Sequence, residues 1–99
     1  MGRGQKRSYQ RFYVGTSAIL IFKDNLKETF LLKDFSPRGG GIFGHHPLQI
    51  NEKVAIIFKV PLLFDRPIRK EAKIAWCNKL QEDVWEGGLD FGLDNLINF

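Results

Sequence analysis

The sequence has very little of what several protein classes depend on. Only one of its 99 residues, Cys77, is a cysteine, so an internal disulfide and a zinc site built from several thiolates are both excluded. No apolar run approaches the ~20 residues that cross a bilayer as a helix. The apolar stretch 12–22 is interrupted by Gly15, Thr16 and Ser17, unlike the core of a signal peptide. We therefore expect a cytoplasmic protein without membrane insertion.

The sequence also lacks an excess of charge outside its first eleven residues. Lys and Arg number 15 against 11 Asp and Glu, which gives a formal net charge of +4. Four of the bases and none of the acids lie in residues 1–11, which leaves residues 12–99 neutral. We predict a flexible basic arm over 1–11 and one folded domain over 12–99. A basic arm on a neutral body favours an anionic partner bound at one place, although such a segment can also be a solubilising tail.

Long helical stripes are absent, and apolar residues instead alternate with a period of two, as in strands. We predict strands over 12–22, 26–33, 42–43, 54–60, 72–77 and 84–91. Six short strands separated by turns favour a small all-β fold, and closing the sheet into a barrel removes exposed edges. After the last strand, Asp94 is placed to cap at most a short C-terminal helical turn.

Turn residues and paired glycines divide these strands. Asp24-Asn25 suits a hairpin turn, and the segment 34–41, which ends in three glycines, is predicted to be a longer turn. Gly87-Gly88 predicts a bulge or tight bend in the last strand. In the fifth strand Trp76 shares the alternation of Ala72 and Ile74, which places it in the core, although a tryptophan at a barrel mouth can also support a purine.

Two short motifs carry the chemistry. Arg7 and Arg11 form an Arg-x-x-x-Arg pair just before the first strand. Asp34, Ser36 and Gly39 form an Asp-x-Ser-x-x-Gly motif between the second and third strands. Each motif is weak alone, but their order within an all-β chain is much more specific. Arg3 and Arg7 have the same spacing, and we prefer the pair that adjoins the strand.

In these motifs the sequence resembles the PilZ domain family. The likeness continues in the segments 72–76 and 88–91, so that it covers nearly the whole chain. The resemblance implies a six-stranded antiparallel, Greek-key-like β-barrel that binds cyclic di-GMP. It also implies a receptor that signals to a downstream protein partner and needs no cofactor. By the same resemblance, the basic residue Lys6, just before the arginine pair, favours binding of two stacked ligand molecules over one.

The residue types suit such a ligand, which carries two phosphates and two guanines. The guanidinium groups of Arg7 and Arg11 can grip a phosphate bidentately or pair with guanine O6 and N7, and Lys6 can add a phosphate contact. Asp34 offers an acceptor for guanine N–H groups, and Ser36 offers a hydroxyl.

The remaining candidate ligand contacts are Gly39, Gly40 and Trp76. Gly39 permits a positive φ and lets a ligand approach the backbone closely. In a plainer interpretation, Asp34 and Ser36 only shape an Asx-type turn.

Two other functions stay open: a small barrel that binds single-stranded nucleic acid, and a PilZ-like adaptor without nucleotide binding. The neutral body makes a nucleic-acid polymer the less favoured partner, because a groove that follows a phosphate backbone needs positive charge spread over the sheet. No nucleophile–base pair is recognisable, so we do not predict an enzyme. The pair His45-His46 is too small a set for a metal site, and we expect the acids Glu82, Asp83 and Glu86 to form a solvated edge.

Overall fold

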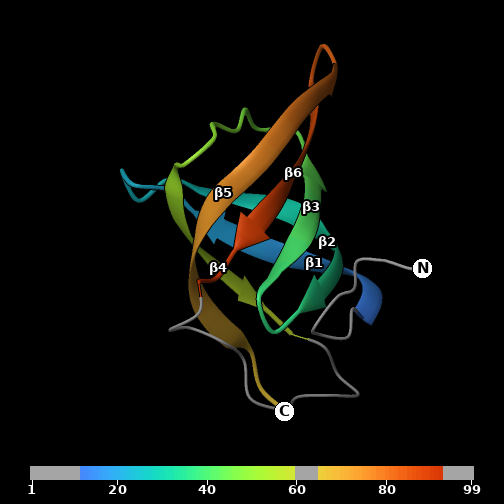
Figure 1. Ribbon diagram of the computed structural model, residues 1–99, viewed down its shortest axis with the longest axis vertical. Coiled ribbons are helices and arrows are strands. Elements are labelled where there is room, and N and C mark those ends of the chain that lie inside the picture. The colour runs from blue at the N-terminus through green and yellow to red at the C-terminus, as the bar shows by residue number, and fades with distance from the viewer. Residues whose placement is uncertain (1–11, 60–64, 93–99) are drawn as a thin grey trace, which may run out of the picture.

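The computed structural model describes residues 12–59 and 65–92. These form six strands: β1 (Phe12–Ile21), β2 (Lys27–Ser36), β3 (Gly39–Gly44), β4 (Lys53–Phe58), β5 (Ile68–Gln81) and β6 (Val84–Asp90). Every pairing is antiparallel, and the strands close into a barrel in the order β1-β2-β3-β6-β5-β4 (Figure 1). The predicted six-stranded antiparallel barrel is confirmed.

The core fills the inside of this barrel, and the alternation in β1 divides its side chains between the core and the outside. Ala18 and Leu20 are buried, whereas Ile19 between them is exposed. Phe35 lies at the centre of an aromatic group, with its ring centroid 5.4 Å from that of Phe12 and 5.4 Å from that of Phe58. Each fully buried side chain of this size contributes about 1.5–3 kcal/mol of hydrophobic free energy. The barrel is therefore held together by inward residues from all six strands.

The hairpin turn between β1 and β2 forms where the sequence predicts it. Asn25 adopts a positive φ of 67°, a conformation that asparagine tolerates better than most residues. The Leu26 amide donates to the Asp24 carboxylate over 3.2 Å, which stabilises the turn locally. The predicted Asp24-Asn25 turn is confirmed.

The predicted long turn over residues 34–41 is wrong. β2 continues to Ser36, β3 begins at Gly39, and only Pro37 and Arg38 lie between them. The three glycines of this segment are strand residues that pair with β2 and β6, and at Gly39 and Gly40 the neighbouring backbone leaves no room for a side chain. A Cβ on Gly39, for example, would overlap the backbone carbonyl oxygen of Leu89 on β6.

β5 is longer than the predicted strand 72–77 at both ends, because it begins at Ile68 and runs to Gln81. Its last four residues, 78–81, are all exposed, so neither face shows the alternation that marks a half-buried strand. This end of β5 and the start of β6 form a hairpin that projects beyond the barrel (Figure 1). The strand ladder of the hairpin holds these exposed residues in extended form.

The predicted bulge lies on the opposite strand from the glycines that suggest it. Ile74 pairs with Leu89 and Trp76 pairs with Gly88, so the extra residue is Ala75 of β5. A bulge of one residue reverses the faces that follow it. Ile74 is therefore fully buried, whereas Trp76 is 44% exposed on the outside. The prediction that Trp76 belongs to the core is wrong for this reason.

Several predicted features lie outside the described residues. These are the basic arm with Lys6, Arg7 and Arg11, and the C-terminal helical turn at Asp94. Within the two described ranges, no helix has both the length and the apolar character that crossing a membrane requires.

Adjacent leucines on β2 test the assignment of the two barrel faces. Leu32 is fully buried and Leu31 is 40% exposed. We expect Leu32→Ala to lower the free energy of unfolding by about 2–5 kcal/mol, because it leaves a cavity in the core. Leu31→Ala, the matched control, should cost less than about 1 kcal/mol. Urea unfolding of both variants measures this, and equal losses would show that the faces are assigned wrongly.

Candidate ligand-binding face

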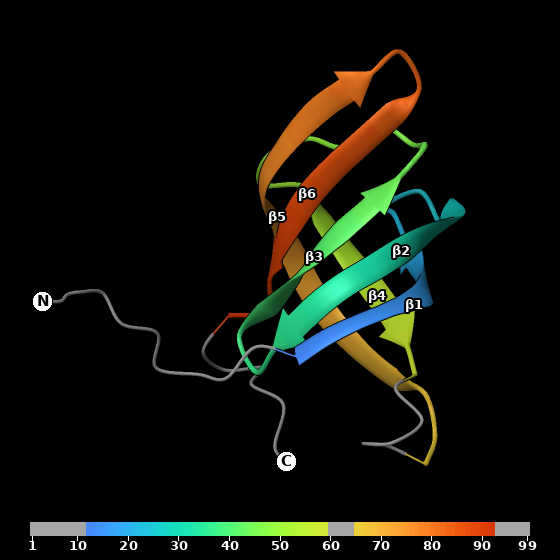
Figure 2. The same ribbon diagram turned by 90° about the vertical axis from the view of Figure 1, so that its right-hand side faces the viewer.

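A row of four paired residues crosses the outer wall of the barrel from β2 to β5. Asp34 pairs with Gly41, Gly41 with Gly88, and Gly88 with Trp76. Directly paired residues of an antiparallel sheet point to the same side, so the four form one outer row. β2, β3 and β6 lie side by side on this wall, with β5 next to β6 (Figure 2).

The indole of Trp76 lies flat on the position that a side chain at Gly88 would occupy. A Cβ on Gly88 would overlap the indole nitrogen and would lie 2.6 Å from the ring carbon Cδ1. The glycine therefore allows the ring to lie against the sheet. Because Trp76 is still 44% exposed, part of its indole is open to stacking from outside.

Asp34 occupies the other end of the outer row, in ordinary van der Waals contact with the Cβ position of Gly41. Both of its carboxylate oxygens lie 3.4 Å from the Cβ position of Gly41. The side chain is half-buried and sits over the glycine. Asp34 and Trp76 thus border two central glycines, and the row presents an acceptor at one end and an aromatic surface at the other.

Ser36 and Gly39 form the pair two positions beyond Asp34 and Gly41, after the pair of Phe35 and Gly40. The Ser36 hydroxyl oxygen accepts a hydrogen bond from the Arg38 amide over 3.3 Å, which supports the turn between β2 and β3. Gly39 pairs with Ser36 on one side and with Asp90 on the other. Both residues therefore shape the end of the two strands beside the outer row.

The expectation of a positive φ at Gly39 needs correction, whereas ligand contact by Gly39 and Gly40 stays a prediction. Positive φ angles among the described glycines occur at Gly15 and Gly92, so Gly39 does not use one. Its role is the close approach of strands described above. A Cβ on Gly40 would lie 3.1 Å from Cδ1 of the buried Leu32, so this residue faces the barrel interior and does not join the outer row.

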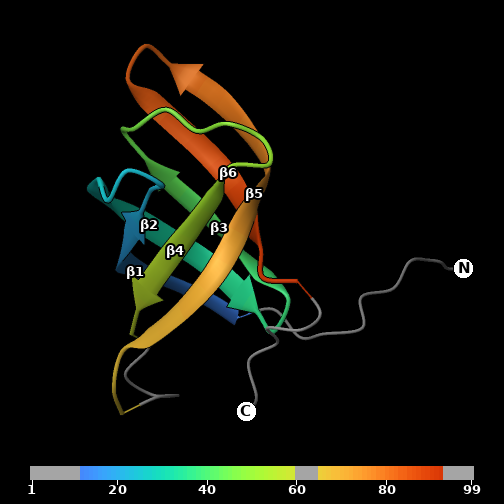
Figure 3. The same cartoon turned by 90° about the vertical axis from the view of Figure 1, so that its left-hand side faces the viewer.

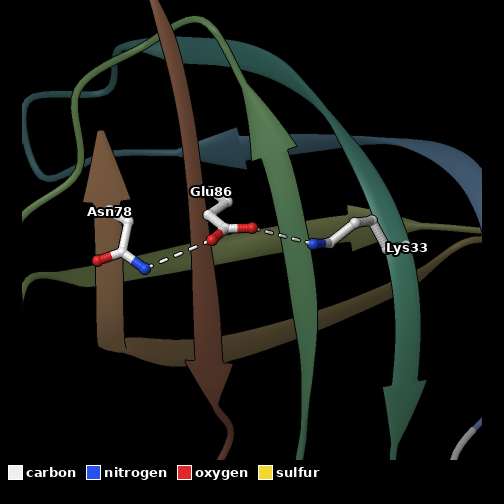
Figure 4. Close-up of polar contacts among 3 residues, drawn as sticks. All are labelled: Lys33, Asn78 and Glu86. Carbon is white, nitrogen blue, oxygen red and sulfur yellow. Dashed lines mark hydrogen bonds and ion pairs between the residues drawn. The ribbon is translucent and has the colours of Figure 1, made fainter. Parts of the chain in front are cut away.

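Sequence reasoning missed a polar network that borders the outer row. The Lys33 ammonium donates to Glu86 Oε1 over 3.4 Å, and the Asn78 amide donates to Glu86 Oε2 over 3.4 Å (Figure 4). Lys33 reaches across β3 to make its contact (Figure 4). Glu86 precedes Gly88 by two residues on β6, so both face outward. The sequence signal that could have revealed Glu86 is its position two residues before Gly88, since residues two apart on a strand face the same side.

Glu86 does not belong to the predicted solvated edge. Its side chain is only 24% exposed, whereas that of Glu82 at the hairpin tip is 97% exposed. On the opposite side of the barrel, β4 lies between β1 and β5 (Figure 3).

The chemistry of this face suits a planar ring with hydrogen-bond donors on its edge. Trp76 offers a stacking surface, and Asp34 and Glu86 offer carboxylate acceptors. Lys33 supplies a positive charge next to them. In the described parts of the chain, no group of three or more His, Cys, Asp or Glu residues is arranged to hold a metal ion. The three predicted basic contacts, Lys6, Arg7 and Arg11, lie outside the described residues.

The PilZ domain family model matches residues 5–97. The matched range includes both arginines of the Arg-x-x-x-Arg pair and all of the Asp-x-Ser-x-x-Gly motif. No curated protein matches the sequence.

Solved structures with the same fold come from several bacteria. The inhibitor of motility MotI/DgrA of Bacillus subtilis has a TM-score of 0.74 at 20% identity, over 93% of this chain and 45% of that one. The PilZ domain of Escherichia coli YcgR, solved with cyclic di-GMP, has a TM-score of 0.66 at 19% identity, over 88% and 78%. PlzA of Borreliella burgdorferi, also in complex with cyclic di-GMP, has a TM-score of 0.65 at 16% identity, over 93% and 36%. The chain thus spans less than half the length of the Bacillus and Borreliella proteins.

Substituting Gly88 tests the seating of the indole. Gly88→Ala places a methyl group where the Trp76 ring lies, so we expect the ring to move outward into water. In a Trp85→Phe background, which leaves Trp76 as the sole tryptophan, its emission should shift to the red and acrylamide quenching should increase. The same background without the alanine is the control. Unchanged quenching would mean that the ring does not rest on Gly88.

Proposed function

Because the chain belongs to the PilZ domain family, we propose that it is a non-catalytic receptor that binds cyclic di-GMP on the outer wall of β2, β3, β6 and β5. One observation carries the proposal: Asp34 and Trp76 lie at the two ends of one row, separated only by glycines. The cyclic di-GMP complexes of YcgR and PlzA support the same ligand for this fold.

The chemistry of the ligand matches the groups on this wall. One guanine stacks on the exposed indole of Trp76, a contact that is worth about 1–3 kcal/mol per base in other aromatic sites. The Asp34 carboxylate accepts N–H donors from the guanine edge, since an ionised carboxylate has only acceptors. Ser36 lies two residues beyond Asp34 on β2, so its hydroxyl is near the same end of the row.

The phosphates require cations that the outer row itself lacks. Arg7 and Arg11 are the candidates, because a guanidinium binds a phosphate through two parallel hydrogen bonds. Lys6 adds a third charge beside them. We place these residues over the wall when the ligand is bound, so that the arm and the barrel hold the ligand between them.

The output of this receptor is a changed surface that a protein partner recognises. Closing the basic arm over a dianionic ligand alters both the charge and the shape of the wall. The positive charge of residues 1–11 then binds the phosphates of a small dinucleotide. The neutral barrel does not favour a nucleic-acid polymer.

Isothermal titration with cyclic di-GMP tests the arginine clamp. We expect Arg7→Ala and Arg11→Ala each to weaken binding by about 1.5–3 kcal/mol, because each removes hydrogen bonds to a charged group. Arg69→Ala is the matched control, since Arg69 is exposed on β5 and forms a 3.5 Å ion pair with Glu71. Affinity unchanged in both arm variants would move the site elsewhere, and a folded wild-type protein without binding heat would refute the function.

The aromatic contact has its own pair of variants. Trp76→Ala should weaken cyclic di-GMP binding by about 1–3 kcal/mol through loss of stacking. Trp76→Phe keeps an aromatic ring, so it should weaken binding by only part of that amount. Trp85→Phe serves as control, because Trp85 packs against the core on the inside of the barrel. In titrations, Trp76→Ala should bind cyclic di-GMP most weakly, Trp76→Phe more tightly and Trp85→Phe most tightly. If Trp76→Ala binds as tightly as the control, no base stacks on this indole.

A further inference from the structure

Glu86 holds a position that the proposed binding mode leaves unused. It lies on β6 two residues before Gly88 and pairs with Asn78, on the same outer face and about 7 Å along the strand from the pair of Gly88 and Trp76. Its two oxygens are held from opposite sides, by Lys33 of β2 and by Asn78 of β5 (Figure 4). The carboxylate is thereby fixed beside the aromatic end of the outer row.

The carboxylate of Glu86 retains capacity for further hydrogen bonds. An ionised carboxylate has about four acceptor positions, and Lys33 and Asn78 each occupy one, on different oxygens. Both contacts measure 3.4 Å, which is longer than the usual 2.7–3.2 Å of such bonds. Each oxygen can therefore accept one more donor, and two parallel donors fit the two oxygens.

Lys33 makes a carboxylate at this place compatible with an anionic ligand. A dianion that approaches an unpaired carboxylate is repelled by it. The ammonium of Lys33, 3.4 Å from Glu86 Oε1, offsets this repulsion and also orients the group. Lys33 is thus a positioning residue that acts through Glu86.

We propose that Glu86 selects guanine over adenine in the ligand, an inference that rests on the proposed function. Guanine presents two adjacent donors, N1–H and N2–H, which pair with the two carboxylate oxygens of Glu86. Adenine presents an acceptor at N1, which faces the carboxylate without a proton between them. Glu86 recognises in this way a base that stacks on Trp76 with its edge towards β6. Asp34, at the far end of the row, contacts the second guanine.

The isosteric substitution Glu86→Gln tests this selection. Glutamine offers one donor and one acceptor, which match adenine N1 and N6–H₂ and mismatch guanine. We expect the ratio of cyclic di-GMP affinity to cyclic di-AMP affinity to fall by about tenfold or more, as for a bidentate base contact. The matched control is Glu82→Gln on the same hairpin, which removes the same charge from a side chain that is 97% exposed.

A second variant separates selection from plain structural support. Lys33→Met leaves Glu86 uncompensated, so it should weaken both dinucleotides, and the double variant Lys33→Met/Glu86→Gln should recover part of that loss. Isothermal titration of all four variants with both dinucleotides gives the ratios. A ratio unchanged in Glu86→Gln, while the wild-type protein binds cyclic di-GMP, overturns this inference alone. A wild-type protein that binds neither dinucleotide overturns the proposed function and the inference with it.

Discussion

The indole of Trp76 rests on the backbone of Gly88, and this contact depends on one extra residue in β5. Without the bulge at Ala75, the alternation that buries Ile74 would carry Trp76 into the core. With it, the largest side chain of the strand lies on the outer wall. Gly88 then has to lack a side chain, because the ring occupies the space of its Cβ. The bulge and the glycine are thus two halves of one arrangement.

The same principle organises the rest of the wall. β3 pairs with both β2 and β6, and its glycines allow close contacts on either side. The Asp34 carboxylate lies over Gly41, and the Leu89 carbonyl fills the space beside Gly39. Closure of the barrel in the order β1-β2-β3-β6-β5-β4 brings β2 and β5 to opposite ends of this glycine-rich centre. Residues far apart in the sequence thereby share one outer face.

The sequence predicts those features that depend on near neighbours along the chain. The alternation of β1 divides its side chains between two faces, and the face with Ala18 and Leu20 is the buried one. The Asp-x-Ser-x-x-Gly motif lies where β2 passes into β3. The sequence does not reveal the bulge, because the extra residue on β5 is defined only by its pairing with β6. The contact between Lys33 and Glu86 joins residues 53 apart across a third strand, so no local pattern contains it. Closure of the barrel brings these residues together on one face.

A receptor of this kind must bind its ligand on the outer wall, and amide NMR measures that contact directly. Cyclic di-GMP is titrated into the protein while the indole N–H of Trp76 and the backbone amides of Gly41 and Gly88 are followed. We predict large shifts of these signals, with the indole N–H of Trp85 and the amides of β4 nearly unchanged. Shifts confined to the wall formed by β1 and β4, or an unchanged spectrum at saturating ligand, would contradict the account.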